Sequence, residues 1–264
     1  RAAGIAVDEV CWDDESIDWS TYNHVVIRST WDYHRRYDEF MQWVRSVSSV
    51  STMSNSLDVI TWNTDKHYLA EVAAMGLPVV PTVFIEPGHE AWLDQVHELL
   101  TQGDVVVKPA ISAGSNDTER HSNIDVAQQH ISELLSAQRS VMLQPYMADV
   151  DVESETGLVF IDGKFSHAFA KGALLAQEKN MSGGLYAEEE IGVRQPTAEQ
   201  LLIGERAVKW LTSRFGKLLY ARVDLLPTAQ GPVIIEIELT EPSLYLLLHP
   251  EAATELANAL IIHS

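Results

Sequence analysis

The sequence predicts an α/β fold, in which strands and helices alternate along the chain. Short runs rich in Val, Ile and Leu, such as residues 105–107 and 141–144, are typical of buried strands. Segments with apolar residues three and four positions apart, such as residues 37–47 and 197–215, are typical of helices that cover a sheet. At roughly 100–200 residues per domain, a chain of 264 residues contains about two domains.

Residues 1–60 predict an N-terminal domain of βαβ type. Its strands are expected at residues 5–10 and 24–27, and its helix at residues 37–47. A Ser-rich linker over residues 46–56 is the first candidate domain boundary. The chain starts at Arg-Ala-Ala-Gly, without Met, which reads as the last turn of a helix with a glycine stop. We therefore expect an earlier strand and most of a helix to be missing from the sequence.

Residues 61–140 and 141–264 form the second and third predicted segments. In chain order, the second should contain a helix at 65–75, a strand at 77–85, a helix at 91–100, a strand at 105–107 and a helix at 126–135 capped by Asp125. The third should contain a strand at 141–144, a hairpin of 157–161 and 165–170, a helix at 197–215 with a Thr197–Gln200 capping box, strands at 220–226 and 233–239, and a helix at 250–262. Residues 172–195 have no clear period, which predicts a mobile loop.

Acidic residues strongly outnumber basic ones, and the formal net charge is −20. The absence of a Lys/Arg cluster argues against a nucleic-acid partner, and the acid excess argues against an anionic membrane surface. No uncharged apolar run approaches the ~18 residues of a membrane span. The single cysteine, Cys11, cannot form an internal disulfide and fits a reducing compartment, so we expect a cytoplasmic protein.

Four charged residues alternate with apolar ones on the strands predicted at the end of the chain. Side chains two apart on a strand share a face, which pairs Arg222 with Asp224 and Glu236 with Glu238. If both pairs lie on one face of a sheet, three carboxylates converge, which favours a Mg²⁺ site. We then expect Asp224 beside Glu236 and Arg222 beside Glu238, with an odd loop or a bulge between the strands. The alternative is a solvated edge strand with outward acids.

Lys108 ends a predicted strand and precedes a loop of small residues that includes Ser112, Gly114 and Ser115. An ammonium group fixed beside a loop rich in backbone N–H groups can hold phosphates. The sequence contains neither a Walker A motif nor G-x-G-x-x-G, so a Rossmann dinucleotide site is unsupported. Taken alone, a strand-end lysine that reaches solvent is the more ordinary interpretation. The downstream carboxylates shift the balance toward a phosphate site.

A polar and aromatic segment follows the strand predicted at residues 24–27. Its residues are Arg28, Ser29, Thr30, Trp31, Asp32 and Tyr33. Ligands bind at such strand ends in open α/β sheets, which makes the segment a candidate substrate loop. In that role Asp32 would pair with an ammonium group and Arg28 with a carboxylate. A surface turn whose Trp31 and Tyr33 pack on the next helix is an equally good interpretation.

Six stretches occur in the order typical of the ATP-grasp superfamily, and with them the chain resembles its glutathione-synthetase-like branch. They are WNTDK, GLPVVPT, VVVKPAISAGS, LQPYM, VESETGLVFIDGKFSHAFAK and RVDLL…VIIEIELTEPSL, within residues 62–244. RSTWDY and SHAFAK also resemble a narrower group, the cyclo-ligases of D-cycloserine biosynthesis, which act on O-ureido-D-serine. The resemblance implies a pre-ATP-grasp domain over 1–60, a central lid subdomain over 61–140, and a C-terminal subdomain with a metal site over 141–264.

The resemblance also implies a role for each matching position. The nucleotide positions are Lys66 and Lys108 at the phosphates, Gln144, Pro145 and Tyr146 at the adenine edge, and Glu155 at the ribose hydroxyls. The metal positions are Asp224, Glu236 and Glu238, which hold two Mg²⁺ ions in relatives, although relatives often have Asn in place of Glu238. The catalytic cations are Arg222 and Lys171, near the transferred phosphate and the carboxylate.

The function implied by the resemblance is an ATP-dependent carboxylate–amine ligase. ATP would convert a small amino-acid-like carboxylate into an acyl phosphate, which a nitrogen nucleophile attacks with release of ADP and phosphate. The first hypothesis is the intramolecular closure of O-ureido-D-serine to D-cycloserine, with ATP and Mg²⁺ as cofactors. The alternatives are an intermolecular peptide-type ligase and a nucleotide-binding module without turnover. A homo-oligomer is compatible with the sequence.

Overall fold

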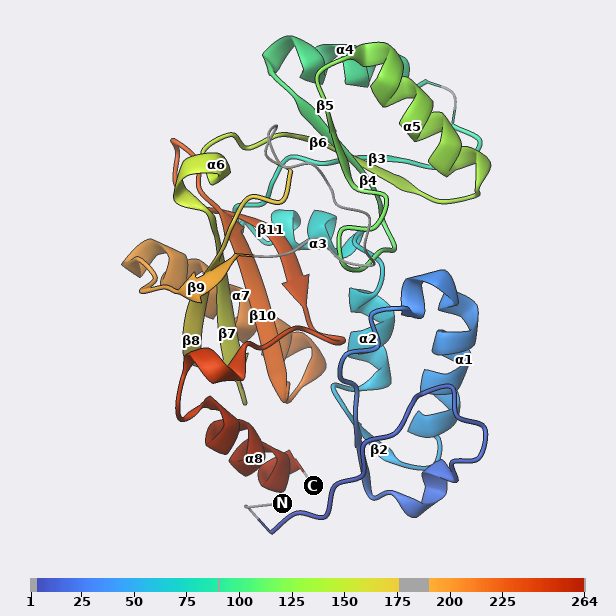
Figure 1. Ribbon diagram of the computed structural model, residues 1–264, viewed down its shortest axis with the longest axis vertical. Coiled ribbons are helices and arrows are strands. Elements are labelled where there is room, and N and C mark those ends of the chain that lie inside the picture. The colour runs from blue at the N-terminus through green and yellow to red at the C-terminus, as the bar shows by residue number, and fades with distance from the viewer. Residues whose placement is uncertain (1–3, 90, 176–189, 264) are drawn as a thin grey trace.

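The computed structural model describes residues 4–89, 91–175 and 190–263, and it confirms the α/β class (Figure 1). Three sheets organise these residues: a parallel pair of strands near the N-terminus, a sheet of four strands and a sheet of five. In Figure 1 the four-stranded sheet lies above the five-stranded sheet, and the N-terminal part lies beside the latter.

The N-terminal part is built on strands β1 (His24–Val26) and β2 (Thr52–Ser54), which pair in parallel. Helix α1 (Tyr37–Ser48) connects them and turns one apolar face inward. Two short 3-10 helices, η1 (Trp19–Thr21) and η2 (Tyr33–Arg35), precede β1 and α1. This arrangement is the predicted strand–helix–strand unit.

Two sequence predictions for the N-terminal part are wrong. The strand predicted at residues 5–10 is irregular and mostly exposed, because no described strand lies beside it to take up its backbone hydrogen bonds. Residues 46–56 are not a linker, because they contain the end of α1 and all of β2. Met53 is 8 % exposed and Asn55 2 %, so the serines of this segment accompany a buried strand.

The four-stranded sheet is antiparallel, and two helices cover one of its faces. In sheet order its strands are β3 (Val83–Ile85), β6 (Val141–Pro145), β4 (Val105–Pro109) and β5 (Glu119–His121). The helices are α4 (Leu93–Gln102) and α5 (Ile124–Ser136), which share an apolar core with the sheet. Strand β6 pairs with β3 and β4, so it belongs to this sheet although the predicted second segment ends just before it.

The helix predicted at residues 126–135 is confirmed, but its predicted cap is not. Helix α5 begins at Ile124, and the Asn123 side chain accepts hydrogen bonds from the backbone N–H groups of Asp125 and Val126. Asn123 has the extended backbone that an N-cap requires, whereas Asp125 already lies in the first helical turn.

The five-stranded sheet is antiparallel and lies between two helices. In sheet order its strands are β11 (Val233–Glu238), β10 (Tyr220–Leu226), β7 (Glu155–Ile161), β8 (Lys164–Lys171) and β9 (Ile191–Val193). Its covering elements are α7 (Ala198–Phe215) on one side, and η3 (Leu246–Leu248) with α8 (Ala252–His263) on the other. The short helix α6 (Val150–Glu153) precedes β7.

The capping box at the start of α7 is confirmed, with Thr197 and Gln200 exchanging side-chain and backbone hydrogen bonds. The loop predicted at residues 172–195 is only partly open to comparison, because residues 176–189 lie outside the described residues. Its final part forms β9, a strand that the sequence did not predict. None of the described helices is long and apolar enough to cross a membrane.

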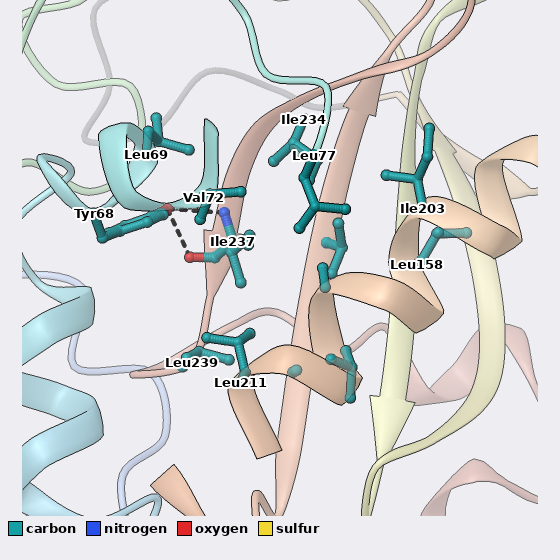
Figure 2. Packing of buried hydrophobic residues seen from close by; sticks show 14 of the residues in the cluster. Tyr68, Leu69, Val72, Leu77, Leu158, Ile203, Leu211, Ile234, Ile237 and Leu239 are labelled. Atoms are coloured by element: carbon teal, nitrogen blue, oxygen red, sulfur yellow. Dashed lines mark hydrogen bonds between the residues drawn. The ribbon is translucent and has the colours of Figure 1, made fainter. Parts of the chain in front are cut away.

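The helix predicted at residues 65–75 is confirmed as α3 (Tyr68–Ala74), and a short helix that the sequence did not predict, α2 (Leu57–Asn63), precedes it. Both pack against the outer edge of β11. The Tyr68 hydroxyl donates to the Ile237 carbonyl and accepts from the Ile237 N–H group, both at 2.8 Å (Figure 2). The apolar side of α3 joins the core between α7 and the sheet (Figure 2).

Other contacts complete the outer edge of β11. The Asn63 side chain donates to the Ile237 carbonyl and accepts from the Leu239 N–H group, both at 2.7 Å. Further along, Ile234 donates to the Pro78 carbonyl at 2.9 Å and accepts from the Val80 N–H group at 3.0 Å. Residues 77–82 therefore lie against β11, and the strand predicted at 77–85 is reduced to β3.

Candidate active site

A cavity of about 550 Å³ is lined by both larger sheets and by the N-terminal part. Strands β4 and β6 contribute to one wall and strands β8, β10 and β11 to another. The predicted site residues on its walls are Trp31, Tyr33, Lys66, Lys108, Ser112, Gly114, Ser115, Gln144, Pro145, Tyr146, Lys171, Arg222, Glu236 and Glu238. A volume of this size suits a nucleotide with a small second ligand.

The register of β10 and β11 confirms the predicted pairing of charged residues. Arg222 is opposite Glu238, Asp224 is opposite Glu236, and the register shifts directly after Asp224, as the predicted bulge requires. The Arg222 guanidinium donates to Asp224 Oδ1 at 2.9 Å and to Asp224 Oδ2 at 2.6 Å, and it also contacts Glu238. We refer to Arg222, Asp224, Glu236 and Glu238 as the charged cluster.

The carboxylates in and around the charged cluster lie close together in a buried wall. Burial raises the pKa of Glu238 well above its usual range, although Arg222 opposes this change. Burial likewise raises the pKa of Glu155 and that of Glu241 to about 7. Crowded carboxylates with raised pKa values favour the binding of a cation. Their hard oxygen donors fit Mg²⁺, so the cluster is suited to the predicted metal.

Two lysines approach the charged cluster. Lys66 Nζ lies 3.1 Å from Glu236 Oε1 and donates to the Ser112 carbonyl at 2.8 Å. Burial would raise the pKa of Glu236, but the ammonium groups of Lys66 and Lys108 lower it. Burial, together with nearby Lys66, lowers the pKa of Lys108 to about 8. Lys108 forms no hydrogen bond or ion pair with the described residues, so its charge is available to a ligand.

The small-residue loop after β4 is anchored at its start and turns sharply at the cavity. The Lys66 N–H group donates to the Ala110 carbonyl at 3.0 Å, and Lys66 Nζ holds the next turn at Ser112. Gly114 and Ser115 both have left-handed backbones, with φ of 61° and 57°. Glycine adopts this conformation at little cost. The loop therefore brings backbone close to the cavity, as a phosphate-binding loop must.

The predicted adenine edge lies at the end of β6. The Gln144 side chain donates to Thr82 Oγ1 at 2.7 Å, and the Tyr146 N–H group donates to the Asp104 carbonyl at 2.8 Å. The guanidinium of Arg120 lies 3.6 Å from the centre of the Tyr146 ring. Sequence reasoning missed Arg120, because its strand, β5, is only three residues long and was not predicted.

The segment RSTWDY reaches the cavity with only two of its residues. Trp31 and Tyr33 line the wall, and Trp31 Nε1 donates to the Glu241 carbonyl at 3.3 Å. The Arg28 guanidinium instead lies over the Tyr220 ring, 5.4 Å from its centre, and Asp32 Oδ1 accepts from Trp12 Nε1 at 3.4 Å.

The other two residues of the segment also lie off the cavity wall, for a backbone reason. Ser29 is exposed and has a left-handed backbone with φ of 56°, which turns the chain away from the direction of β1. Thr30 Oγ1 is buried without a hydrogen-bond partner among the described residues. Alternation along a strand cannot predict directions beyond such a turn.

Glu155 and Asp224 stand behind the cavity wall rather than on it. Glu155 Oε1 lies 4.0 Å from Lys171 Nζ, and Asp224 is held by Arg222. The cavity also has residues that the sequence did not single out, namely Asn63, Glu241, Ser243 and Tyr245. The sequence could have indicated Glu241 as a site residue, because it follows the two predicted metal ligands in the run EIELTE.

The charged cluster, two lysines and a small-residue loop lie between two antiparallel sheets, and this arrangement defines the ATP-grasp fold. D-alanine–D-alanine ligase from Bacillus anthracis has this fold, with a TM-score of 0.66 and 17 % identity over 86 % of this chain and 76 % of that chain.

Comparisons with more similar proteins narrow the class. Residues 1–55 match the family described as the N-terminal domain of D-cycloserine synthetase DcsG. The cycloserine biosynthesis protein DcsG of Streptomyces lavendulae is 36 % identical over an alignment of 273 positions, which spans 98 % of this chain and 89 % of that protein. The crystal structure of D-cycloserine synthetase DcsG matches with a TM-score of 0.89 and 34 % identity, over 98 % of this chain and 90 % of that one. The chain belongs to the DcsG family of ATP-grasp ligases.

Proposed function

We propose that the protein catalyses the ATP-dependent ring closure of O-ureido-D-serine to D-cycloserine. The observation that carries the proposal is the charged cluster beside a cavity that Trp31 and Tyr33 also line. Family membership supports the same substrate class, because one relative is named a cycloserine biosynthesis protein and the other a D-cycloserine synthetase. The ligand would be a small amino-acid-like carboxylate beside ATP.

The lysines and the small-residue loop are proposed to bind the nucleotide. The Lys108 ammonium group has no hydrogen bond or ion pair among the described residues, and Lys66 fixes the loop at Ser112. Backbone N–H groups at Gly114 and Ser115 would face the phosphates. Gln144, Pro145 and Tyr146 would meet the adenine edge, with Arg120 holding the Tyr146 ring by a cation–π contact. Glu155 remains the proposed ribose contact.

Asp224, Glu236 and Glu238 are proposed to hold Mg²⁺, with two ions as the expected number. When bound, the metal neutralises charge on the transferred phosphoryl group. Arg222 is fixed by Asp224 and Glu238, so its guanidinium is held in place without reorganisation during the reaction. Lys171, with its ammonium group near Glu155, is the second proposed catalytic cation.

Ring closure follows from the formation of an acyl phosphate in this cavity. The substrate carboxylate takes the γ-phosphoryl group of ATP, and the nitrogen bonded to the side-chain oxygen then attacks the carbonyl carbon. The bond from carbon to the phosphate oxygen breaks, and phosphate leaves. Atom balance requires the carbamoyl group to leave with one water, as carbon dioxide and ammonia. Trp31 and Tyr33 would exclude other water and hold the substrate folded.

The test is product analysis by mass spectrometry with O-ureido-D-serine and ATP as the only substrates. We expect D-cycloserine, ADP and phosphate in equal amounts, with ammonia as a coproduct. A requirement for a second amine substrate would instead identify an intermolecular peptide-type ligase. ATP binding without any turnover over a panel of amino-acid-like carboxylates would point to a binding module.

We also propose domain boundaries and a cellular location for the enzyme. The division into segments 1–60, 61–140 and 141–264 stays a proposal, with β6 joining the second segment through its strand pairing. A cytoplasmic location is proposed from the single cysteine, Cys11. Size-exclusion chromatography with light scattering would show whether the protein forms a homo-oligomer.

A further inference from the structure

A second group of potential metal ligands lies on the face of the four-stranded sheet that the cavity does not use. In the pairing of β4 with β5, His121 is opposite Val105 and Glu119 is opposite Val107. Both valines belong to the apolar core under α4 and α5. Cross-strand neighbours share a face, so His121 and Glu119 point toward α5. Figure 1 shows α5 lying along this face, next to β5.

Helix α5 supplies a third side chain at the same place. His130 Nδ1 lies 2.9 Å from His121 Nε2, and Glu119 Oε2 lies 3.8 Å from His121 Nε2. The ligand atoms of the three residues all lie within 4.8 Å of one another. The two histidines are 5 % and 9 % exposed, whereas the Glu119 side chain is 58 % exposed and leaves a route from solvent.

We propose that Glu119, His121 and His130 bind a transition-metal ion of the Zn²⁺ class. Tetrahedral Zn²⁺ with bonds of about 2.0–2.1 Å places neighbouring ligand atoms about 3.3 Å apart. The separations of 2.9 and 3.8 Å lie on either side of that value. Two imidazoles with one carboxylate favour such an ion, whereas the all-oxygen charged cluster favours Mg²⁺. Water would complete the fourth position from the exposed side of Glu119.

The site has a structural consequence for the nucleotide cavity. Strand β5 contains three residues and lies at the edge of its sheet, so a metal bound to α5 would fix it. Arg120, between the two β5 ligands, points to the opposite face and contacts the ring of Tyr146. Occupancy of the site should therefore hold Arg120 in place and moderately strengthen nucleotide binding.

The first experiment uses Co²⁺ as a spectroscopic probe on the full chain. The protein is stripped with chelator and titrated with Co²⁺ in excess Mg²⁺, which keeps the oxygen-ligand sites occupied. We expect one equivalent of tetrahedral Co²⁺, seen by its visible absorption and displaced by Zn²⁺. The absorption should be absent in His130→Ala and retained in His97→Ala, which changes an exposed histidine on α4 of the same subdomain.

A second variant covers the case in which His130→Ala fails to fold. Glu119→Gln changes an exposed side chain and should leave the core intact. Loss of an outer-shell partner costs about 10–100-fold in metal affinity, so loss of this direct ligand should cost at least about tenfold. Failure of the wild-type protein to bind Co²⁺ in Mg²⁺ would overturn the proposal and leave His121 and His130 as a hydrogen-bonded pair only. Loss of the absorption in Glu236→Gln, with Glu119→Gln unaffected, would also overturn it by placing the ion at the charged cluster.

Discussion

Two regions meet at the cavity, and they differ in how they hold their polar residues. The strand pair β10–β11 presents the charged cluster from regular backbone, where Arg222 and Glu238 lie opposite each other. The segment from Arg28 to Tyr33 presents its residues from a loop and a short 3-10 helix. In the first region the pairing that alternation predicts is present, and three of the four residues, Arg222, Glu236 and Glu238, line the cavity. In the second region only the two aromatic residues line it.

A polar pattern predicts side-chain positions more reliably on a regular strand than in a loop. On a strand, a side chain can face only one of two ways, and pairing with a neighbour fixes which. In a loop, one left-handed residue such as Ser29 redirects everything that follows. We therefore expect substitutions in the strand pair to affect the chemistry, and those in the loop to affect substrate binding or nothing.

The largest effect is expected from the strand pair, with Glu236→Gln. The variant keeps the volume of the side chain but loses its negative charge, both for the metal and for Lys66. Turnover should fall by about 10²–10³-fold or more, the range for loss of one charge-stabilising group. Steady-state kinetics at saturating Mg²⁺ measures it, with circular dichroism to verify folding. Glu205→Gln, on the exposed side of α7, is the matched control. Near-normal turnover in Glu236→Gln would remove this residue from the metal site.

The second-largest effect is expected from the cavity wall formed by β4 and β6, with Lys108→Ala. Loss of one charge-assisted contact to phosphate should weaken nucleotide binding by about 1.5–3 kcal/mol, or roughly 10–150-fold. Isothermal titration calorimetry with ADP measures the change. Lys164→Ala, an exposed lysine at the start of β8, is the control and should bind normally. Equal affinity in the two variants would mean that Lys108 does not contact the nucleotide.

A smaller effect should appear in the pH dependence of the same lysine. The pKa of Lys108 is lowered to about 8, so the ammonium form that attracts phosphate is lost as the pH rises through that value. Nucleotide affinity should therefore decrease between about pH 7 and pH 9 in the wild-type protein. Lys108→Met should bind weakly and show a flatter profile over this range. A wild-type profile with no decrease would contradict the assignment.

The smallest effect compares two neighbours in the loop. Trp31→Ala removes part of the cavity wall and should raise KM for the small substrate, by about 1–2 kcal/mol of apolar contact or roughly 5–30-fold. Asp32→Asn should leave KM within about twofold, since Asp32 contacts Trp12 outside the cavity. Initial-rate kinetics at saturating ATP measures both. A raised KM in Asp32→Asn alone would restore Asp32 as the ammonium contact.

The same distinction explains how much of the fold was predictable. Helix α7 is predicted by its apolar spacing, by the Thr197 cap and by Gly216 at its end. Strand β10 has the predicted bounds. Strand β2 was missed because its three residues, Thr52–Ser54, are too few to show an alternating pattern, and pairing with β1 makes them a strand. Strands β5 and β9 also contain only three residues each, and they were missed because so short a stretch shows no period.

Within the site, contacts between segments far apart in the sequence could not be predicted from the sequence. Lys66 was known from its motif, but its bond to Ser112 brings together residues 46 positions apart. Arg120 carries no motif, and its place beside Tyr146 depends on a strand pairing that tertiary structure decides. Glu241 was predictable, because it continues the run of acids that contains Glu236 and Glu238.

The covered edge of β11 has a consequence for solubility. An edge strand with the sequence VIIEIE offers free backbone groups to another chain, and such edges promote intermolecular association. Here Tyr68 and Asn63 occupy the outward groups of Ile237, and residues 78–80 occupy those of Ile234. The strand that carries two of the proposed metal ligands is thus shielded from addition of a foreign strand for as long as α2 and α3 stay folded against it.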